Sequence, residues 1–224
     1  MEQATSENNG YMNIKKGQVI EFGSYDGDKD KFNRKEPIEW IVLDVDDKEG
    51  VALLLSKYCL ERLSYLEECT DVTWETCTLR KWLNDEFYDE AFSLSEKQRI
   101  LLTTIKNPDN PEGTPGGNDT KDRVFLLSYE DMINNGYGFS EDPVEKDINR
   151  RSALAEDKER SPLKDGETVD GEFSSWWWLR FPGPYRKGAC VVNDNGTVDS
   201  HVVCDGTNFS IPCVRPALYI NLNS

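Results

Sequence analysis

Three apolar runs in the N-terminal third of the chain predict β-strands. They cover residues 19–23, 38–45 and 51–56, and each is rich in Val, Ile, Leu or aromatic residues. The polar stretch 46–50 separates the last two runs and contains the residues that favour a reversal of the chain. The pattern therefore predicts an antiparallel meander.

A change of period in the middle of the chain predicts helices. Leu79, Trp82, Leu83 and Phe87 follow the spacing of an apolar stripe on a helix, which Thr76 or Thr78 would cap. Residues 95–98 have a capping-box pattern that predicts a second short helix, followed by a helix end or a strand at 100–105.

The following segments alternate between loop and regular structure. Prolines and glycines at 107–122 predict a long loop, and residues 124–127 predict a short buried strand. Ser128 would begin a further helix by the same capping pattern. The charge-dense stretch 141–172 predicts a surface helix near 149–159 and then a loop.

The C-terminal third returns to β-structure and completes the fold prediction. Asn195-Gly196 is a strong hairpin signal, and strands are expected at 176–180, 189–192, 197–204 and 214–220. Strands at both ends with helices between them predict an α+β fold, in which the terminal strands share one mixed or antiparallel sheet. We expect a disordered tail at 1–16 and one domain at 17–224.

Charge and hydropathy exclude two classes of protein. The 26 basic and 42 acidic residues give a net charge of −16, which opposes binding to nucleic acid. Mean hydropathy is −0.67, and the sequence has no apolar stretch near the roughly 18 residues that cross a membrane. If Met1 is the native start, the polar N-terminus predicts a cytoplasmic protein; otherwise an exported protein with its signal peptide removed remains open.

The six cysteines and the acidic loops offer little evidence for a metal. The cysteines form no CxxC pair and the chain has one histidine, so structural zinc is not expected and buried free thiols are favoured. Asp26, Asp28 and Asp30 have the alternate spacing that opens a calcium loop, but Lys31 stands where that loop requires glycine. We expect neither a metal nor a cofactor.

Four motifs carry a family resemblance. The segment 176–183, WWWLRFPG, and the segment 214–218, VRPAL, resemble the WWLRSPG-like and GVRPAL-like motifs of an uncharacterised family of gut Firmicutes domains. Residues 37–43 and 79–84 resemble the same family. The resemblance implies a C-type-lectin-like fold, shared with formylglycine-generating enzymes. The cysteines of this chain lack the local spacing that formylglycine chemistry would require.

The only histidine raises an enzymatic alternative. If Asn195 and Gly196 form a two-residue turn, Cys190 lies opposite His201 on the neighbouring strand, with Asp199 nearby. Such a group could act as a Cys-His-Asp nucleophilic site. A four-residue turn would instead place Asp199 opposite Cys190, and a solvated strand histidine is the simpler interpretation.

The leading hypothesis is a non-enzymatic module that binds a glycan or protein ligand. We expect the aromatic, Asn and Asp residues of the C-terminal loops to form one surface, with Trp176 or Trp178 as an aromatic platform. Arg180 and Arg215 would form structural ion pairs, with the binding of a ligand carboxylate as the alternative for both. A structural or assembly subunit remains a further alternative. The predicted binding residues are Trp176, Trp178, Arg180, Tyr185, Arg186, Asn193, Asp194 and Asn208.

Overall fold

The computed structural model describes residues 13–26, 35–68, 70–152, 175–203 and 211–223, without the side chains of 200–203. Its larger sheet has the strand order β1-β2-β3-β12-β7, and every neighbouring pair is antiparallel. The strands are β1 (Val19–Tyr25), β2 (Glu36–Asp46), β3 (Val51–Ser56), β12 (Ala217–Asn221) and β7 (Val124–Phe125). The predicted meander and the shared sheet of N- and C-terminal strands are therefore confirmed.

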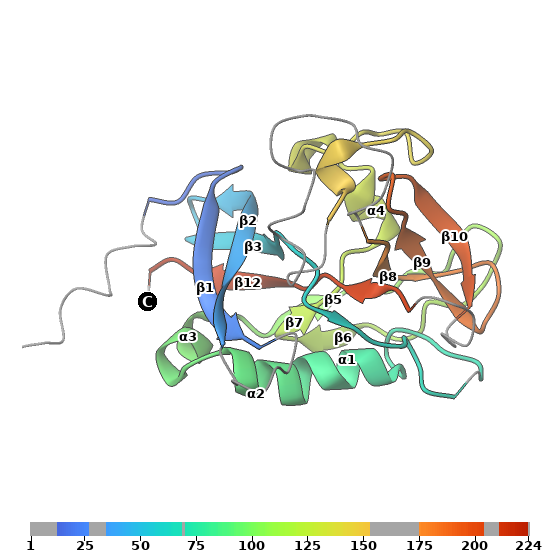
Figure 1. Cartoon of the computed structure of the whole chain (residues 1–224), viewed down its shortest axis with the longest axis horizontal. Coiled ribbons are helices and arrows are strands. Elements are labelled where there is room, and N and C mark those ends of the chain that lie inside the picture. The colour runs from blue at the N-terminus through green and yellow to red at the C-terminus, as the bar shows by residue number, and fades with distance from the viewer. Residues whose placement is uncertain (1–12, 27–34, 69, 153–174, 204–210, 224) are drawn as a thin grey trace, which may run out of the picture.

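A second sheet lies beside the first (Figure 1) and has the order β10-β9-β8-β11-β4. Among the described strands of this sheet, β11 and β8 are the pair that runs parallel. The strands are β10 (Val198–Val203), β9 (Gly188–Val192), β8 (Trp177–Pro182), β11 (Cys213–Val214) and β4 (Glu61–Arg62). A separate pair joins β5 (Thr103–Ile105) to β6 (Thr120–Asp122), so the loop predicted at 107–122 ends in a strand.

One predicted strand is divided between the two sheets. Residues 214–220 were expected to be continuous, but β11 ends at Val214 and β12 begins at Ala217. Pro216 interrupts the ladder because it has no N–H to donate, although its carbonyl accepts from the Ser56 N–H at 2.9 Å. The break lets the C-terminal segment connect both sheets.

The predicted helical middle is present with different caps. It comprises α1 (Thr78–Trp82), the π-helical η1 (Leu83–Phe87), α2 (Tyr88–Ala91) and α3 (Leu94–Arg99), which lie along one side of both sheets (Figure 1). Cys77, rather than Thr76 or Thr78, caps α1 through its thiol. Ser93 and Glu96 form the capping box of α3, two residues before the expected start.

The segment between the sheets is largely irregular. Ser128 precedes α4 (Tyr129–Met132), as predicted, and Asp131 accepts from the Ser128 N–H at 2.7 Å. Two 3-10 turns follow, η2 (Asn135–Tyr137) and η3 (Ile148–Arg150). The helix expected near 149–159 begins only as η3, and its remainder lies largely outside the described residues.

Candidate functional site

The predicted binding residues do not form one surface, because they lie at opposite ends of β9. Tyr185 and Arg186 are in the loop 183–187 before β9, whereas Asn193 and Asp194 are in the turn after it. A strand of 5 residues spans roughly 16 Å. We call the loop 183–187 the Tyr185 face. We call the surface formed by segments 138–150 and 193–197 the Asp194 face. Asn208 lies outside the described residues.

Buried amide and hydroxyl groups fix the Tyr185 face. Asn110 donates to the carbonyl of Gly183 at 2.7 Å, and Thr114 donates to the carbonyl of Pro184 at 3.0 Å. Tyr185 is 66% exposed, and Arg186 lies 3.8 Å from Asp71 in an exposed ion pair. This face displays an aromatic and a basic side chain, but an exposed ion pair contributes little energy.

The tryptophan platform is not present in the form expected. Trp178 is fully buried and donates from its indole to the carbonyl of Leu63 at 2.9 Å, and Trp177 is also fully buried. Both tryptophans of β8 are therefore covered, whereas Trp176, which precedes β8, is partly exposed. The expectation for Trp178 was wrong because alternation in a strand exposes one face only when no second layer covers it.

Arg180 forms the structural ion pair that was one of its two predicted roles. Its Nη1 lies 3.0 Å from Asp131 and donates to the carbonyl of Leu126 at 2.7 Å. Arg215 is different: it donates to the carbonyls of Ser56 and Arg150 and lies over the Trp177 ring at 4.9 Å. Burial lowers the pKa of Arg215 to about 10, which leaves it charged at neutral pH.

The thiol of Cys190 is unsuited to be an activated nucleophile. It is buried and lies 3.6 Å from the carbonyl of Pro182. Burial, with smaller contributions from Asp199, Glu112 and Glu130, raises the pKa of Cys190 to about 12. A nucleophilic cysteine needs a lowered pKa, so this environment opposes the Cys-His-Asp alternative.

The turn after β9 also differs from the two-residue hairpin that was expected. Val198 pairs with Val192 and Asn193 donates to Thr197, so three residues form the loop. A bulge between Asp199 and Val202 then shifts the register. Cys190 therefore lies opposite the bulge that contains His201, whose side chain is outside the description.

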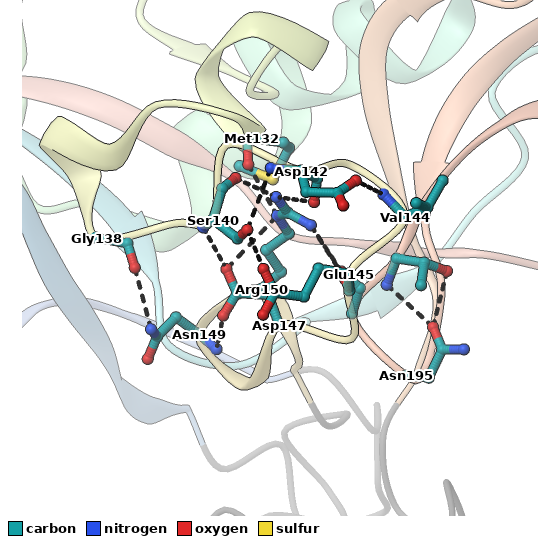
Figure 2. A network of polar contacts seen from close by, with 12 residues as sticks. Met132, Gly138, Ser140, Asp142, Val144, Glu145, Asp147, Asn149, Arg150 and Asn195 are labelled. Carbon is teal, nitrogen blue, oxygen red and sulfur yellow. Dashed lines mark hydrogen bonds and ion pairs between the residues drawn. The ribbon is translucent and has the colours of Figure 1, made fainter.

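A fully buried arginine organises the Asp194 face. Figure 2 shows the guanidinium of Arg150 surrounded by backbone carbonyls of the 132–145 segment. It donates to Met132 at 2.8 Å, to Asp142 at 3.0 Å, and also to Ser140, Glu145 and Gly196. Asp147 lies 3.6 Å from Nε and supplies the opposite charge. Few conformations of the loop can satisfy all of these donors at once.

The same network holds the loop against the β9–β10 turn. Pro143 accepts from the Val198 N–H at 2.7 Å, and Arg151 donates to the carbonyl of Asp194 at 3.0 Å. Gly196 has a φ of 85°, and a Cβ at this position would lie 2.1 Å from the carbonyl oxygen of Asp147. The glycine therefore permits both the left-handed turn and the close approach of the two segments.

Two apolar side chains project from this hydrogen-bonded loop into solvent. Val144 is 73% exposed and Ile148 is 43% exposed. Exposed acidic residues accompany them, namely Glu141, Asp142, Glu145 and Asp194. Single exposed apolar side chains are common on protein surfaces, so it is their place on a loop held by Arg150 that makes Val144 and Ile148 candidate contact residues.

Metal and membrane features are absent from the part of the chain that the structure describes. No three His, Cys, Asp or Glu residues among those described are grouped as metal ligands. Of the possible calcium-loop residues, Asp28 and Asp30 lie outside the described ranges. Within those ranges, no helix has the length and apolar character needed to cross a membrane.

Comparison with known proteins gives one match. The pattern of the domain of unknown function DUF6273 matches residues 49–222, which is most of the chain. The chain belongs to the DUF6273 family. No curated protein and no solved structure matches it. The DUF6273 match includes both candidate faces but begins after β2, although β1 and β2 complete the same sheet.

Sequence reasoning located Asp194 within this DUF6273 domain but missed the residues that shape the surrounding face. Arg150 was read as one charge in a charge-dense stretch, and Val144 and Ile148 were not distinguished within it. The sequence did contain one signal for this face: Val144 and Ile148 are isolated apolar residues among the acids of 141–149. The burial of Arg150 depends on contacts with Gly196, far away in sequence, and has no local signal.

Proposed function

We propose that this protein is a non-enzymatic ligand-binding module and that its Asp194 face binds a protein segment. The observation that carries the proposal is the buried Arg150, which fixes a loop displaying Val144 and Ile148. A surface that is ordered before binding avoids part of the entropy cost of association. The loop is therefore suited to recognition rather than only to connecting two strands.

Charge supports a partner that is basic as well as apolar. The acids around Val144 and Ile148 outnumber the one nearby exposed base, Lys146, and the whole chain carries −16. Complementary charge favours Lys and Arg in the partner, while apolar side chains would cover the two exposed aliphatic residues. A second copy of the same face would bring like charges together, which disfavours self-association there.

The environment of Cys190 supports binding over catalysis. A thiol with a raised pKa is almost entirely protonated at neutral pH and is a weak nucleophile. The Asp194 face lies at the other end of β9 from the Tyr185 face and presents mainly aliphatic and acidic side chains. These features favour recognition as the main activity.

We infer further that the fold is C-type-lectin-like. In support, β12 returns to the sheet begun by the N-terminal strands, and the tryptophan-rich β8 belongs to a smaller second sheet that carries irregular loops. The resemblance of the tryptophan motif to gut Firmicutes domains points the same way. In such a layout, loops can differ without disturbing the sheets that support them.

Peptide binding tests the proposed function. Synthetic peptides that combine Lys or Arg with Leu or Phe would be compared with matched peptides carrying Glu in place of the bases. The double variant Val144→Ser with Ile148→Ser should weaken binding of the basic peptides at least about tenfold, because it removes the apolar anchors. Added salt should weaken binding further.

Leu94→Ser is the matched control, since Leu94 is 82% exposed but lies on α3. It should leave peptide binding unchanged. Equal binding of basic and acidic peptides, or loss of binding in Tyr185→Ala but not in the Val144 and Ile148 variant, would contradict the proposal.

A further inference from the structure

A second group of polar side chains lies where the two sheets meet the segment 128–137. Asp44 and Tyr219 both pair with Leu53, from opposite sides, so they occupy one row across the larger sheet. The Tyr219 ring stacks on Phe125 with centroids 5.7 Å apart. Tyr137 of η2 and Asp131 of α4 belong to the segment that passes this row, since η2 packs on β2 and the negative charge of Asp131 raises the pKa of both Tyr137 and Tyr219.

Among the described residues, Arg180 is the cation that contacts this group. Its ion pair with Asp131 and its position 5.9 Å from the Phe125 centroid place the guanidinium beside the two aromatic rings. Its Nε is buried and has no hydrogen-bond partner among the described residues. A charged donor without a partner costs free energy, so the protein alone does not satisfy Arg180.

The two phenols remain neutral at physiological pH. Burial raises the pKa of Tyr137, and the fields of Tyr219, Asp131 and Asp44 raise it further, against a smaller opposite effect of Arg180. Burial and Asp131 likewise raise the pKa of Tyr219. Both phenols are half-buried, and neither hydroxyl has a hydrogen-bond partner in the described ranges. Each can therefore donate to a ligand and accept from it.

We propose that Arg180, Asp131, Tyr137 and Tyr219 form a binding site for a neutral sugar. The carboxylates of Asp131 and Asp44 would repel a small anion more than the single guanidinium attracts it. The guanidinium of Arg180 would repel a small cation, so the charges of the site favour an uncharged ligand. Sugar hydroxyls both donate and accept, which matches phenols beside an Arg-Asp pair. The half-exposed ring of Tyr219 offers an apolar surface for the sugar ring.

This site goes beyond the protein-binding function and does not depend on it. Its residues come from β8, β12, α4 and η2, whereas the Asp194 face is formed by 138–150 and 193–197. Binding beside the Arg180–Asp131 ion pair should change the environment of the Arg180 guanidinium, including its Nε.

Nuclear magnetic resonance of the full chain tests the site, with the Arg180 Nε–Hε signal as the probe. D-glucose, D-galactose and N-acetyl-D-glucosamine would be titrated separately, and sodium acetate would serve as the anionic comparison. At least one sugar should shift the Arg180 signal saturably, and acetate at the same concentration should not. Tyr137→Phe and Tyr219→Phe should each weaken sugar binding about fivefold, since each removes one hydrogen bond and keeps the ring.

Tyr185→Phe is the control, because it removes a phenol hydroxyl from the loop between β8 and β9, where Tyr185 is 66% exposed and has no described contact with Asp131, Tyr137 or Tyr219. It should leave the sugar titration unchanged, and the amide spectra of all three variants would establish that they remain folded. Absence of a saturable Arg180 shift with all three sugars would overturn the proposal. A larger shift with acetate, or unchanged sugar affinity in both phenol variants at the site, would do the same. Peptide binding at the Asp194 face would be unaffected by any of these outcomes.

Discussion

Arg150 places a positive charge inside the protein and surrounds it with five backbone carbonyls and the Asp147 carboxylate. Such a group is stable only when every partner stays in position, because an unpaired buried charge is costly. Its own carbonyl also accepts from the Trp177 indole at 3.1 Å. One side chain thus connects the exposed loop to the tryptophan-rich core.

Replacing Arg150 tests this connection at the residue scale. Arg150→Met removes the cation and leaves Asp147 buried without it, which should reduce the free energy of unfolding by about 3–5 kcal/mol in a urea titration. Lys146→Met changes an exposed cation in the same loop and should alter stability by less than about 0.5 kcal/mol. Similar values for the two variants would contradict the role assigned to Arg150.

The pH dependence of Cys190 reactivity tests the case against an enzyme. Its pKa lies near 12 instead of the ordinary 9.0, so the thiol form should persist through pH 9 in the native protein. The reactive thiolate should appear only above that range, and alkylation mapped to Cys190 by mass spectrometry should stay slow until the protein unfolds. Rapid labelling with a midpoint at or below pH 8 would revive the nucleophile hypothesis.

Residue type alone indicated some site residues and misled on others. The acidic, Asn- and Gly-rich turn marked Asp194 as exposed, and an arginine in an apolar strand correctly implied an ion pair for Arg180. The tryptophans were misjudged because Trp178 packs against Tyr65 and Trp177 lies under the guanidinium of Arg215. Those neighbours come from distant parts of the sequence.

At the scale of elements, the local patterns predicted strands better than their assignment to sheets. Periodicity and turn residues located β1, β3, β9 and the helical middle to within a few residues. The same patterns could not reveal that Pro216 divides the last strand between two sheets. The strands before and after Pro216 are both largely apolar, and an apolar pattern does not indicate to which sheet a strand belongs. The Cys77 cap was missed since cysteine is an uncommon capping residue.

A comparison of Gly196 and Gly138 distinguishes the cost of backbone strain in a turn from the cost of a steric clash. Gly196 and Gly138 have nearly equal φ values, 85° and 88°, but a Cβ at Gly138 would meet nothing within 4 Å. Gly138→Ala should cost roughly 1 kcal/mol from backbone strain alone. Gly196→Ala should cost clearly more, because its Cβ would clash with the Asp147 carbonyl and separate the turn from the loop. Equal melting temperatures for the two variants would contradict this contact.

At the scale of the whole molecule, β9 separates two surfaces of different chemistry. The Tyr185 face carries aromatic and basic side chains, and the Asp194 face carries aliphatic and acidic ones. The sequence suggested a single surface because the predicted residues of both groups, from Tyr185 to Asp194, fall within ten positions. A strand that runs between them places neighbours in sequence at opposite ends of a sheet.

Hydrogen-exchange mass spectrometry with a bound peptide tests the central claim most directly. The basic and apolar peptide that binds most tightly would be added to the full chain, and amide protection would be compared with that of the free protein. The account predicts added protection at 138–150 and 193–197, with the loop 183–187 unchanged. Protection confined to 183–187, or no protection at 138–150 when the peptide is saturating, would contradict it.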